Sequence, residues 1–417
     1  MPEFQTSPGM RDILPPESER WRRFVDTFAA TVGSAGYGQV IPPLLEDIGV
    51  FHRVGEATDV VTKEMYDFVD KGDRHVALRP EQTASVCRAF VQHRPPTPWK
   101  VWYCGPNFRY EKPQRGRFRQ FDQVGVEVLG PDDPMVDVEV IALGWRFLRR
   151  LGLDALTLKV NSLGEPADRV AFMAALRAHF EADLDRLTPE SRTTLSKNPL
   201  RVLDSKRPED GPSIATAPRI GDFLGDTARA SFAAVRSGLD ALDIPYTVDE
   251  RLVRGLDYYR LTTFEYVGGT LDSAQNALGG GGRYDGLVED LGGPATPGVG
   301  FAIGLDRSLL ACDDEGVFAS EAANVEVFVV DTTGGLEATR ISDELRRAGV
   351  AADRAFENRS MKSQMKAADR SGARWAVIVG PDELAAGTAV LRPLRAEGEQ
   401  SVVSRSELIT TIQRERA

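Results

Sequence analysis

The sequence predicts an α/β (α+β) protein: a large unit built on an antiparallel sheet and interrupted by a helical insertion, followed by a small α/β unit. Three observations predict it. Short strands and glycine turns fill residues 74–128 and 252–310, a pattern typical of antiparallel pairing. Helical patterns broken by prolines fill residues 165–243. From residue 325 a fresh β-α-β-α-β pattern begins.

Composition limits the class of protein. The 417 residues allow roughly two or three domains. No apolar run is long enough to span a membrane, and the N-terminus lacks the regions of a signal peptide, so a cytoplasmic location is expected. Cys87, Cys104 and Cys312 are widely spaced, which argues against disulfides or structural zinc. The net charge of −11 argues only weakly against nucleic acid, because phosphate binding depends on local basic density.

The first predicted element is a helix over residues 18–34, whose apolar residues recur at helical spacing. It leads into the segment Val40–Glu46, which contains Pro42 and Pro43. This helix and strand could pack within one core or across a dimer interface, and the residues alone favour neither.

A basic hairpin over residues 107–127 comes next and is the most informative stretch of the chain. Five basic residues crowd around a turn that contains Pro113 and Gly116: Arg109, Lys112, Arg115, Arg117 and Arg119. On the returning strand apolar residues alternate with Gln123, Gly125 and Glu127. Such a hairpin could aim guanidinium groups at a polyphosphate while Gln123 and Glu127 line a pocket. The alternative is a solvated basic hairpin on the surface.

Further elements follow in order. A helix is predicted over residues 134–151, a short strand over Leu156–Val160, and the insertion after it. In the C-terminal part, strands are predicted at residues 325–330, 375–379 and 388–391, with a helix at 360–371. The boundary between the two parts is expected near residues 313–316.

Three more clusters carry chemistry. Leu78–Thr83 places Glu81 and Thr83 just after a proline, although an ordinary N-terminal helical turn would look the same. Arg254–Tyr259 packs a guanidinium, a carboxylate and two phenols together, although aromatic pairs in strands are often core packing. Ala277–Gly286 is a glycine run that lets backbone approach closely. It matches neither the Rossmann nor the P-loop pattern.

Taken together, these segments resemble the class II aminoacyl-tRNA synthetases, and within them the histidyl-tRNA synthetase family. The helix leading to Pro43, the hairpin 107–127 and Gly300–Arg307 resemble the three motifs of the class. Arg254–Tyr259 and residues 281–286 resemble two signatures of the histidyl family, and Asn198–Asp204 resembles its insertion. The resemblance implies a class II synthetase-like antiparallel-sheet catalytic domain over residues 1–320, with a helical insertion at about 165–243. It also implies an anticodon-binding domain over residues 321–417.

The resemblance also implies roles for single residues. The α-ammonium of histidine would be held by Glu81, Thr83 and Gln123. The imidazole would be bracketed by Glu127 and Tyr259, with Tyr258 alongside. The catalytic arginines would be Arg254 and Arg109, which would also contact the histidine, and ATP would be held by Arg109, Arg117 and Arg307. Gln114 and Arg115 would meet the tRNA acceptor end.

The implied reaction joins L-histidine to its tRNA through histidyl-adenylate, with ATP as substrate, Mg²⁺ as cofactor and a homodimer as the assembly. The sequence departs from the family pattern twice: Gln82 stands where glycine is expected, and Asp306 replaces a glutamate, so no metal ligands are assigned. One alternative is the catalytically silent regulatory subunit of ATP phosphoribosyltransferase, which lacks an anticodon-binding domain. A second alternative, a tRNA-binding sensor, requires a fused signalling domain for which the chain has no room.

Overall fold

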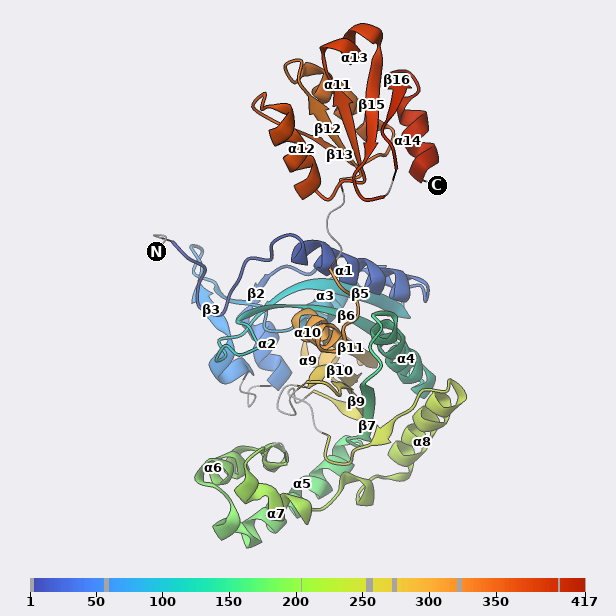
Figure 1. The fold of residues 1–417 in the computed structure, drawn as a ribbon. Helices are drawn as coiled ribbons and strands as arrows, with labels where there is room; N and C mark the ends of the chain where they lie inside the picture. The colour runs from blue at the N-terminus through green and yellow to red at the C-terminus, as the bar shows by residue number, and fades with distance from the viewer. Residues whose placement is uncertain are drawn as a thin grey trace. The chain divides into compact units, whose positions relative to one another are not determined.

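A computed structural model describes residues 4–55, 60–203, 205–252, 258–271, 276–320, 325–396 and 398–416. The chain forms two compact units (Figure 1). The first consists of Met1–Ile13 and Arg20–Ala319, and the second of Leu14–Glu19 and Ser320–Ala417. Over the described ranges no helix is both long enough and apolar enough to cross a membrane.

The first unit is organised around a sheet that has eight strands among the described residues. Their spatial order is β1 (Gly38–Gln39), β5 (Trp99–Phe108), β6 (Gln120–Leu129), β11 (Gly298–Gly304), β10 (Ala277–Arg283), β9 (Arg260–Gly268), β7 (Leu156–Ser162) and β8 (Thr247–Val248). Neighbouring strands are antiparallel except for the outer pairs β1–β5 and β7–β8, which are parallel. The predicted antiparallel sheet and the hairpin of β5 and β6 are therefore confirmed.

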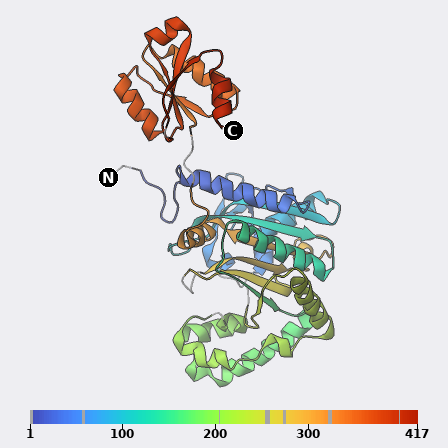
Figure 2. The same cartoon turned by 45° about the vertical axis from the view of Figure 1, so that its right-hand side comes forward.

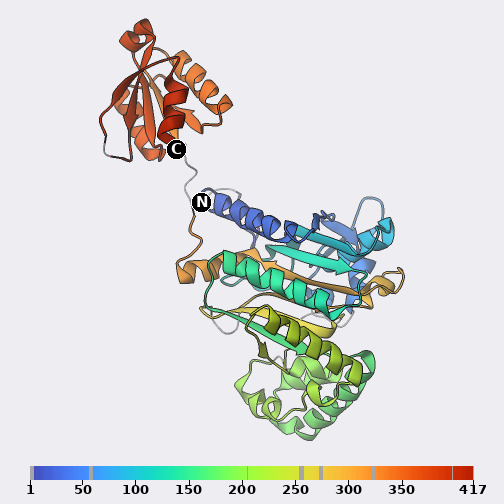
Figure 3. The same cartoon turned by 90° about the vertical axis from the view of Figure 1, so that its right-hand side faces the viewer.

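Helices α1 (Glu17–Gly33) and α4 (Pro134–Arg150) cover one face of this sheet (Figure 3). Phe28 of α1 packs edge-on against Phe147 of α4, with ring centroids 5.0 Å apart, and against Phe301 of β11. α8 (Asp226–Ala241) and α10 (Leu305–Glu315) contribute to the same core. The alternating residues of β6 explain this packing, because Val124, Val126 and Val128 all belong to this core.

Leu129 of β6 belongs to the opposite face, where α3 (Thr83–His93), α2 (Ile48–Gly55) and α9 (Leu287–Asp290) share a second core. A three-stranded sheet of β2 (Leu45–Asp47), β4 (His75–Leu78) and β3 (Tyr66–Val69) adjoins them, and a π-helical turn at Val60–Glu64 precedes β3. Arg88 of α3 pairs with the buried Glu46 of β2 at 2.6 Å and so joins the helix to this small sheet.

The insertion forms a helical lobe beside the sheet (green in Figure 2). It contains α5 (Pro166–Ala182), α6 (Pro189–Lys197), α7 (Gly211–Ala215) and the 3₁₀ turns Leu184–Arg186, Pro199–Val202, Pro208–Asp210 and Ile220–Asp222. Apolar side chains such as Phe172, Leu176 and Phe180 give it a core of its own. The range predicted for the insertion also includes α8, whose Val235 and Leu239 pack in the main core.

The second unit has a five-stranded sheet among its described residues. Its order is β13 (Ala352–Arg354), β12 (Val327–Asp331), β14 (Trp375–Val379), β15 (Thr388–Pro393) and β16 (Ser401–Ser404). The first three strands are parallel to one another. β15 pairs antiparallel with both of its neighbours, β14 and β16. Helices α11 (Leu336–Arg347) and α14 (Leu408–Arg416) share one core, α12 (Met361–Arg370) packs in another, and α13 (Pro381–Ala386) precedes β15. The predicted β-α-β-α-β pattern is confirmed.

Candidate active site

A cavity of about 210 Å³ opens in the first unit. Segments far apart in the sequence form its walls: the first turn of α3, the β5–β6 hairpin, the tyrosines before β9, strands β10 and β11, and the start of α10. The described walls include eight of the residues selected from the sequence: Glu81, Thr83, Arg109, Arg117, Gln123, Tyr258, Tyr259 and Arg307. The structure thus brings together residues that span more than half of the chain.

Backbone carbonyls hold two of the arginines of the cavity in place. Arg109 donates through Nε to the Pro80 carbonyl at 2.9 Å, and its guanidinium lies 5.2 Å from the centre of the Phe121 ring. Arg307, in the first turn of α10, donates to the carbonyls of Gly116 and Ala277 at 3.2 and 3.1 Å. These bonds orient the two guanidinium groups but do not neutralise their positive charges, because the acceptors are uncharged carbonyls.

Arg117 is the third arginine, and it forms a 2.8 Å ion pair with Glu111. Burial, and then the positive charge of Arg117, lowers the pKa of Arg307, and Arg109 acts in the same direction. Three guanidinium groups that repel one another are stabilised by a ligand with several negative charges. This side of the cavity is therefore built for a polyanion.

Glu81 caps the first turn of α3 from the cavity wall. Its carboxylate accepts from the backbone N–H groups of Thr83 at 2.6 Å and Ala84 at 2.9 Å. Burial nevertheless raises the pKa of Glu81. Next to it, Gln82 donates through Nε2 to the Gly105 carbonyl at 3.2 Å, so the residue that replaces the expected glycine is bonded to β5.

Glu127 is fully buried and lies behind the cavity wall. Its Oε1 accepts from the Thr83 hydroxyl at 2.7 Å and the Tyr103 hydroxyl at 3.2 Å, and its Oε2 accepts from the Tyr284 hydroxyl. Burial raises the pKa of Glu127 to about 8, although these hydroxyl groups oppose the increase. Thr83 and Tyr103 line the cavity, so they separate this carboxyl from the open space.

Two close backbone approaches shape the floor around Glu127. A Cβ added at Gly300 would lie 1.8 Å from Glu127 Oε2, and one added at Gly281 would lie 1.9 Å from the Gly300 carbonyl oxygen. Side chains are therefore excluded at both positions, and close packing of β10 against β11 accounts for Gly279 and Gly281 of the glycine run.

The tyrosine pair forms an aromatic wall. The rings of Tyr258 and Tyr259 lie with centroids 4.6 Å apart, and both side chains are buried. Tyr258 also meets Tyr284 edge-on at 5.7 Å, which links this wall to the partner of Glu127. Gln123 completes the wall on β6, where it accepts from Asn107 at 2.8 Å.

Sequence reasoning missed two groups in these walls, Tyr103 and Asp122. Burial, and then the charge of Asp306, raises the pKa of Asp122 to about 6. Asp306 itself accepts from Arg11 at 2.8 Å. Asp122 directly precedes Gln123 on β6. A charged residue next to a predicted site residue was the signal in the sequence that could have identified Asp122 as part of the site.

Other predicted residues lie elsewhere. Gln114 and Arg115 are not among the cavity walls; Arg115 pairs with Asp314 at 2.9 Å. Arg254 falls in residues 253–257, outside the described residues. Among the described residues no three acidic, histidine or cysteine side chains gather as a metal site requires. Glu111 and Asp306 are each paired with arginine and Glu81 caps a helix, so these carboxylates do not fit a protein-held Mg²⁺.

Comparison with known proteins reveals similarity over the whole chain. The family model described as histidyl-tRNA synthetase matches residues 9–307, and the one described as anticodon binding domain matches residues 325–415. The histidine–tRNA ligase of Corynebacterium urealyticum is 47% identical over 98% of this chain and 96% of its own length. That of Geobacillus kaustophilus is 46% identical, with 97% of each chain covered.

Solved structures of histidyl-tRNA synthetases are also similar to this chain. The apo histidyl-tRNA synthetase of S. aureus superposes with a TM-score of 0.83 at 36% identity, covering 98% of this chain and 100% of that one. The histidyl-tRNA synthetase of Nostoc sp. has a TM-score of 0.72 at 23% identity over the full length of both chains, which shows the fold alone.

Proposed function

Because the chain belongs to the histidyl-tRNA synthetase family, we propose that it ligates L-histidine to its tRNA through histidyl-adenylate, releasing pyrophosphate and AMP. The observation that supports this most is the cavity itself. Three mutually repelling arginines line one side of it, and a buried carboxyl ringed by hydroxyl groups lies behind another. A triphosphate fits the first feature, and a ring with two nitrogens fits the second.

Histidine would occupy the side of the cavity near α3 and β6. Glu81 and Gln123 each present a side-chain oxygen there, and with Thr83 they would hold the α-ammonium. Glu127 and Tyr259 would bracket the imidazole, with Tyr258 alongside, and the Glu127 carboxyl would act through the Thr83 and Tyr103 hydroxyls. This buried hydrogen-bonding group would then select a polar ring over an apolar one.

ATP would lie against the arginines. Arg109 would contact the α-phosphate and the histidine carboxylate, Arg117 the outer phosphates, and Arg307 the adenine face and the phosphates. Arg254, carried over from the sequence, would act with Arg109 where the new bond forms. In-line displacement at phosphorus depends mainly on positioning and charge neutralisation, which guanidinium groups provide. No step is assigned to Mg²⁺.

The second unit supports a tRNA partner, because it matches the anticodon-binding model. This unit would contact the anticodon stem of the tRNA. Gln114 and Arg115, which lie outside the cavity walls, would contact the acceptor end. A homodimer would cover apolar residues exposed in the first unit near the small sheet: Ile41, Leu44, Leu45, Phe68 and Val69. We also place the enzyme in the cytoplasm, where its tRNA is found.

The deciding experiment is ATP–pyrophosphate exchange with each standard amino acid in turn. Only histidine should support exchange, and histidine should then appear on tRNA from the same reaction. Exchange with another amino acid would contradict the proposed substrate. A complete lack of exchange would favour the regulatory-subunit alternative.

A further inference from the structure

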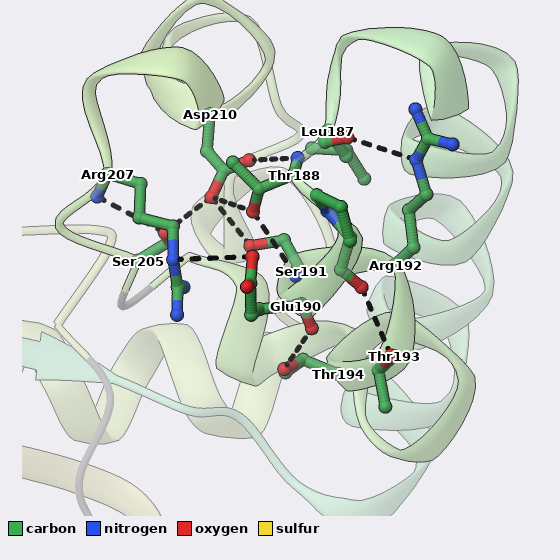
Figure 4. Close-up of polar contacts among 11 residues, drawn as sticks. Leu187, Thr188, Glu190, Ser191, Arg192, Thr193, Thr194, Ser205, Arg207 and Asp210 are labelled. Carbon is green, nitrogen blue, oxygen red and sulfur yellow. Dashed lines mark hydrogen bonds and ion pairs between the residues drawn. The ribbon is translucent and has the colours of Figure 1, made fainter.

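A buried carboxylate ties the insertion together at Asp210 (Figure 4). Asp210 is fully buried at the end of the 3₁₀ turn Pro208–Asp210. Its Oδ1 accepts from the Thr188 backbone N–H at 2.8 Å. Its Oδ2 accepts from the hydroxyls of Ser191 at 2.6 Å, Ser205 at 2.5 Å and Thr188 at 3.2 Å. One side chain thus joins the start of α6, the turn before it and the loop at residue 205.

Asp210 is charged at neutral pH. Burial alone would raise the pKa of this carboxyl, but the hydroxyls of Ser191 and Ser205 and the donors of Thr188 outweigh burial and hold the pKa below its usual range. A buried charge with four donors is costly to leave unpaired, so each donor is held firmly.

The segments joined by Asp210 carry basic side chains. Lys206 and Arg207 directly follow Ser205, and Lys197 ends α6. Arg207 lies 3.9 Å from Glu190, also on α6. Together with Arg201, these three basic residues line one wall of a second cavity of about 980 Å³. The hydrogen bonds of Asp210 thus fix the backbone beneath a basic rim of Lys197, Arg201, Lys206 and Arg207.

The second cavity meets the first. Val60, Arg109, Glu111 and Arg117 line both, so the second cavity leads from the insertion to the phosphate side of the candidate active site. Its described walls hold seven basic residues and three acidic ones, in a chain whose net charge is −11. Such a local excess of positive charge suits a nucleic-acid backbone.

We propose that Asp210 is a positioning residue, which presents the basic rim of the second cavity to the phosphates of a tRNA acceptor end. This inference rests on the proposed function, which requires the terminal ribose of a tRNA to reach the adenylate. Lysine and arginine lose rotamer freedom when they bind, and a backbone that is already fixed adds no further ordering cost to that loss. Asp210 acts through Lys206 and Arg207 and touches no substrate.

Two variants test the inference in the full-length enzyme. Ser205→Ala removes one hydrogen bond of Asp210, the one to the loop that carries Lys206 and Arg207. Asp210→Asn weakens all of them. Arg186→Ala is the matched control: it removes one positive charge from a 71% exposed side chain of the insertion that is absent from the walls of the second cavity.

Single-turnover transfer from preformed adenylate to tRNA should slow by about 10- to 100-fold in both variants, the cost of a misplaced binding element. Adenylate formation should stay within about 2-fold of the unmodified enzyme, because the misplaced element lies outside that chemistry. The log–log salt dependence of tRNA affinity should become shallower by about 0.7 for each phosphate that the rim no longer neutralises. A purely structural role would leave that slope unchanged.

Normal transfer and an unchanged salt slope in both variants would overturn the inference, as would an equal loss in both half-reactions. The same loss of transfer with Arg186→Ala would also overturn it, because the effect would then come from general charge. If the unmodified enzyme forms no histidyl-adenylate, the proposed function fails instead, and the two failures are told apart by the exchange assay.

Discussion

The Thr83 hydroxyl donates a 2.7 Å hydrogen bond to Oε1 of Glu127, joining the first turn of α3 to the C-terminal part of β6. The two residues are 44 positions apart in the chain. Thr83 lines the cavity and Glu127 does not. The hydroxyl thus connects a buried carboxyl to the cavity surface.

Glu127→Gln should lower kcat/KM for histidine by about 10²-fold, the cost of replacing a buried carboxyl that can ionise by an amide that cannot. The KM for ATP should change little, because the arginines that would hold ATP lie on other segments. Steady-state exchange kinetics measure both constants. Thr83→Ser, which keeps the hydroxyl, is the control and should stay near wild type. Unchanged histidine kinetics in the glutamine variant would show that Glu127 does not serve the substrate.

Asp122→Asn should alter how stability depends on pH. The pKa of Asp122 in the folded protein is about 6, above the value near 4 of an unfolded aspartate, so the native state binds the proton more tightly. Stability contributed by the protonated form is therefore lost as pH rises from about 4 to about 6, by at most about 3 kcal/mol. The asparagine variant should gain melting temperature relative to wild type across that window. A pH-independent difference in thermal unfolding would contradict the assignment.

Asp137→Asn should destabilise the first unit by about 3 kcal/mol, because it leaves the buried charge of Arg283 with Asp285, a partly exposed carboxylate 3.3 Å away, as its nearest ion-pair partner. Asp137 and Arg283 form an ion pair with side chains only 0% and 2% exposed. Asp132→Asn is the matched control: Asp132 lies 3.8 Å from the same arginine, but its side chain is 82% exposed. Asp132→Asn should lower the free energy of unfolding by less than about 1 kcal/mol. Denaturant unfolding followed by tryptophan fluorescence compares the two, and equal losses would count against the burial argument.

Deleting residues 325–417 should spare adenylate formation and damage charging of tRNA. The described cavity walls all lie in the first unit, whereas the match to the anticodon-binding model lies in the second. Pyrophosphate exchange and aminoacylation are measured on the same preparation. An equal loss of both activities would point to a structural role for the C-terminal unit.

Arg254→His should slow adenylate formation by about 10²–10³-fold, the cost of losing one preorganised donor to a transition state. Transfer from preformed adenylate to tRNA should suffer much less. The prediction rests on the sequence, since Arg254 falls outside the described residues. Rapid-quench measurement of the two half-reactions decides it, and unimpaired adenylate formation would remove Arg254 from catalysis.

Local pattern was enough to predict the strands that form the site. The alternation along β6 predicted a strand with Gln123 and Glu127 on one face, and in the structure Val124, Val126 and Val128 alternate with them and pack in the main core. The turn with Pro113 and Gly116 likewise marked the hairpin, whose strands end and begin at Phe108 and Gln120.

Contacts between distant segments could not be predicted in this way. Nothing in the sequence around Glu127 indicates that Tyr103 and Tyr284 donate to its carboxylate, because those bonds depend on strand order. The network around Asp210 was missed for the same reason: its donors come from residues 5 to 22 positions away, across irregular turns. Hydrophobic periodicity carries no signal for such polar contacts.

The close approach of Gly281 and Gly300 limits how this protein could be re-engineered for a different amino acid. A methyl group at Gly300 would collide with the Glu127 carboxylate, and one at Gly281 would collide with the neighbouring strand. Mutant libraries that vary these two positions would consist mainly of misfolded members. Diversity is better placed at Thr83, Gln123 and Tyr259, whose side chains line the cavity. The glycines at positions 281 and 300 would therefore have to be kept in any such redesign.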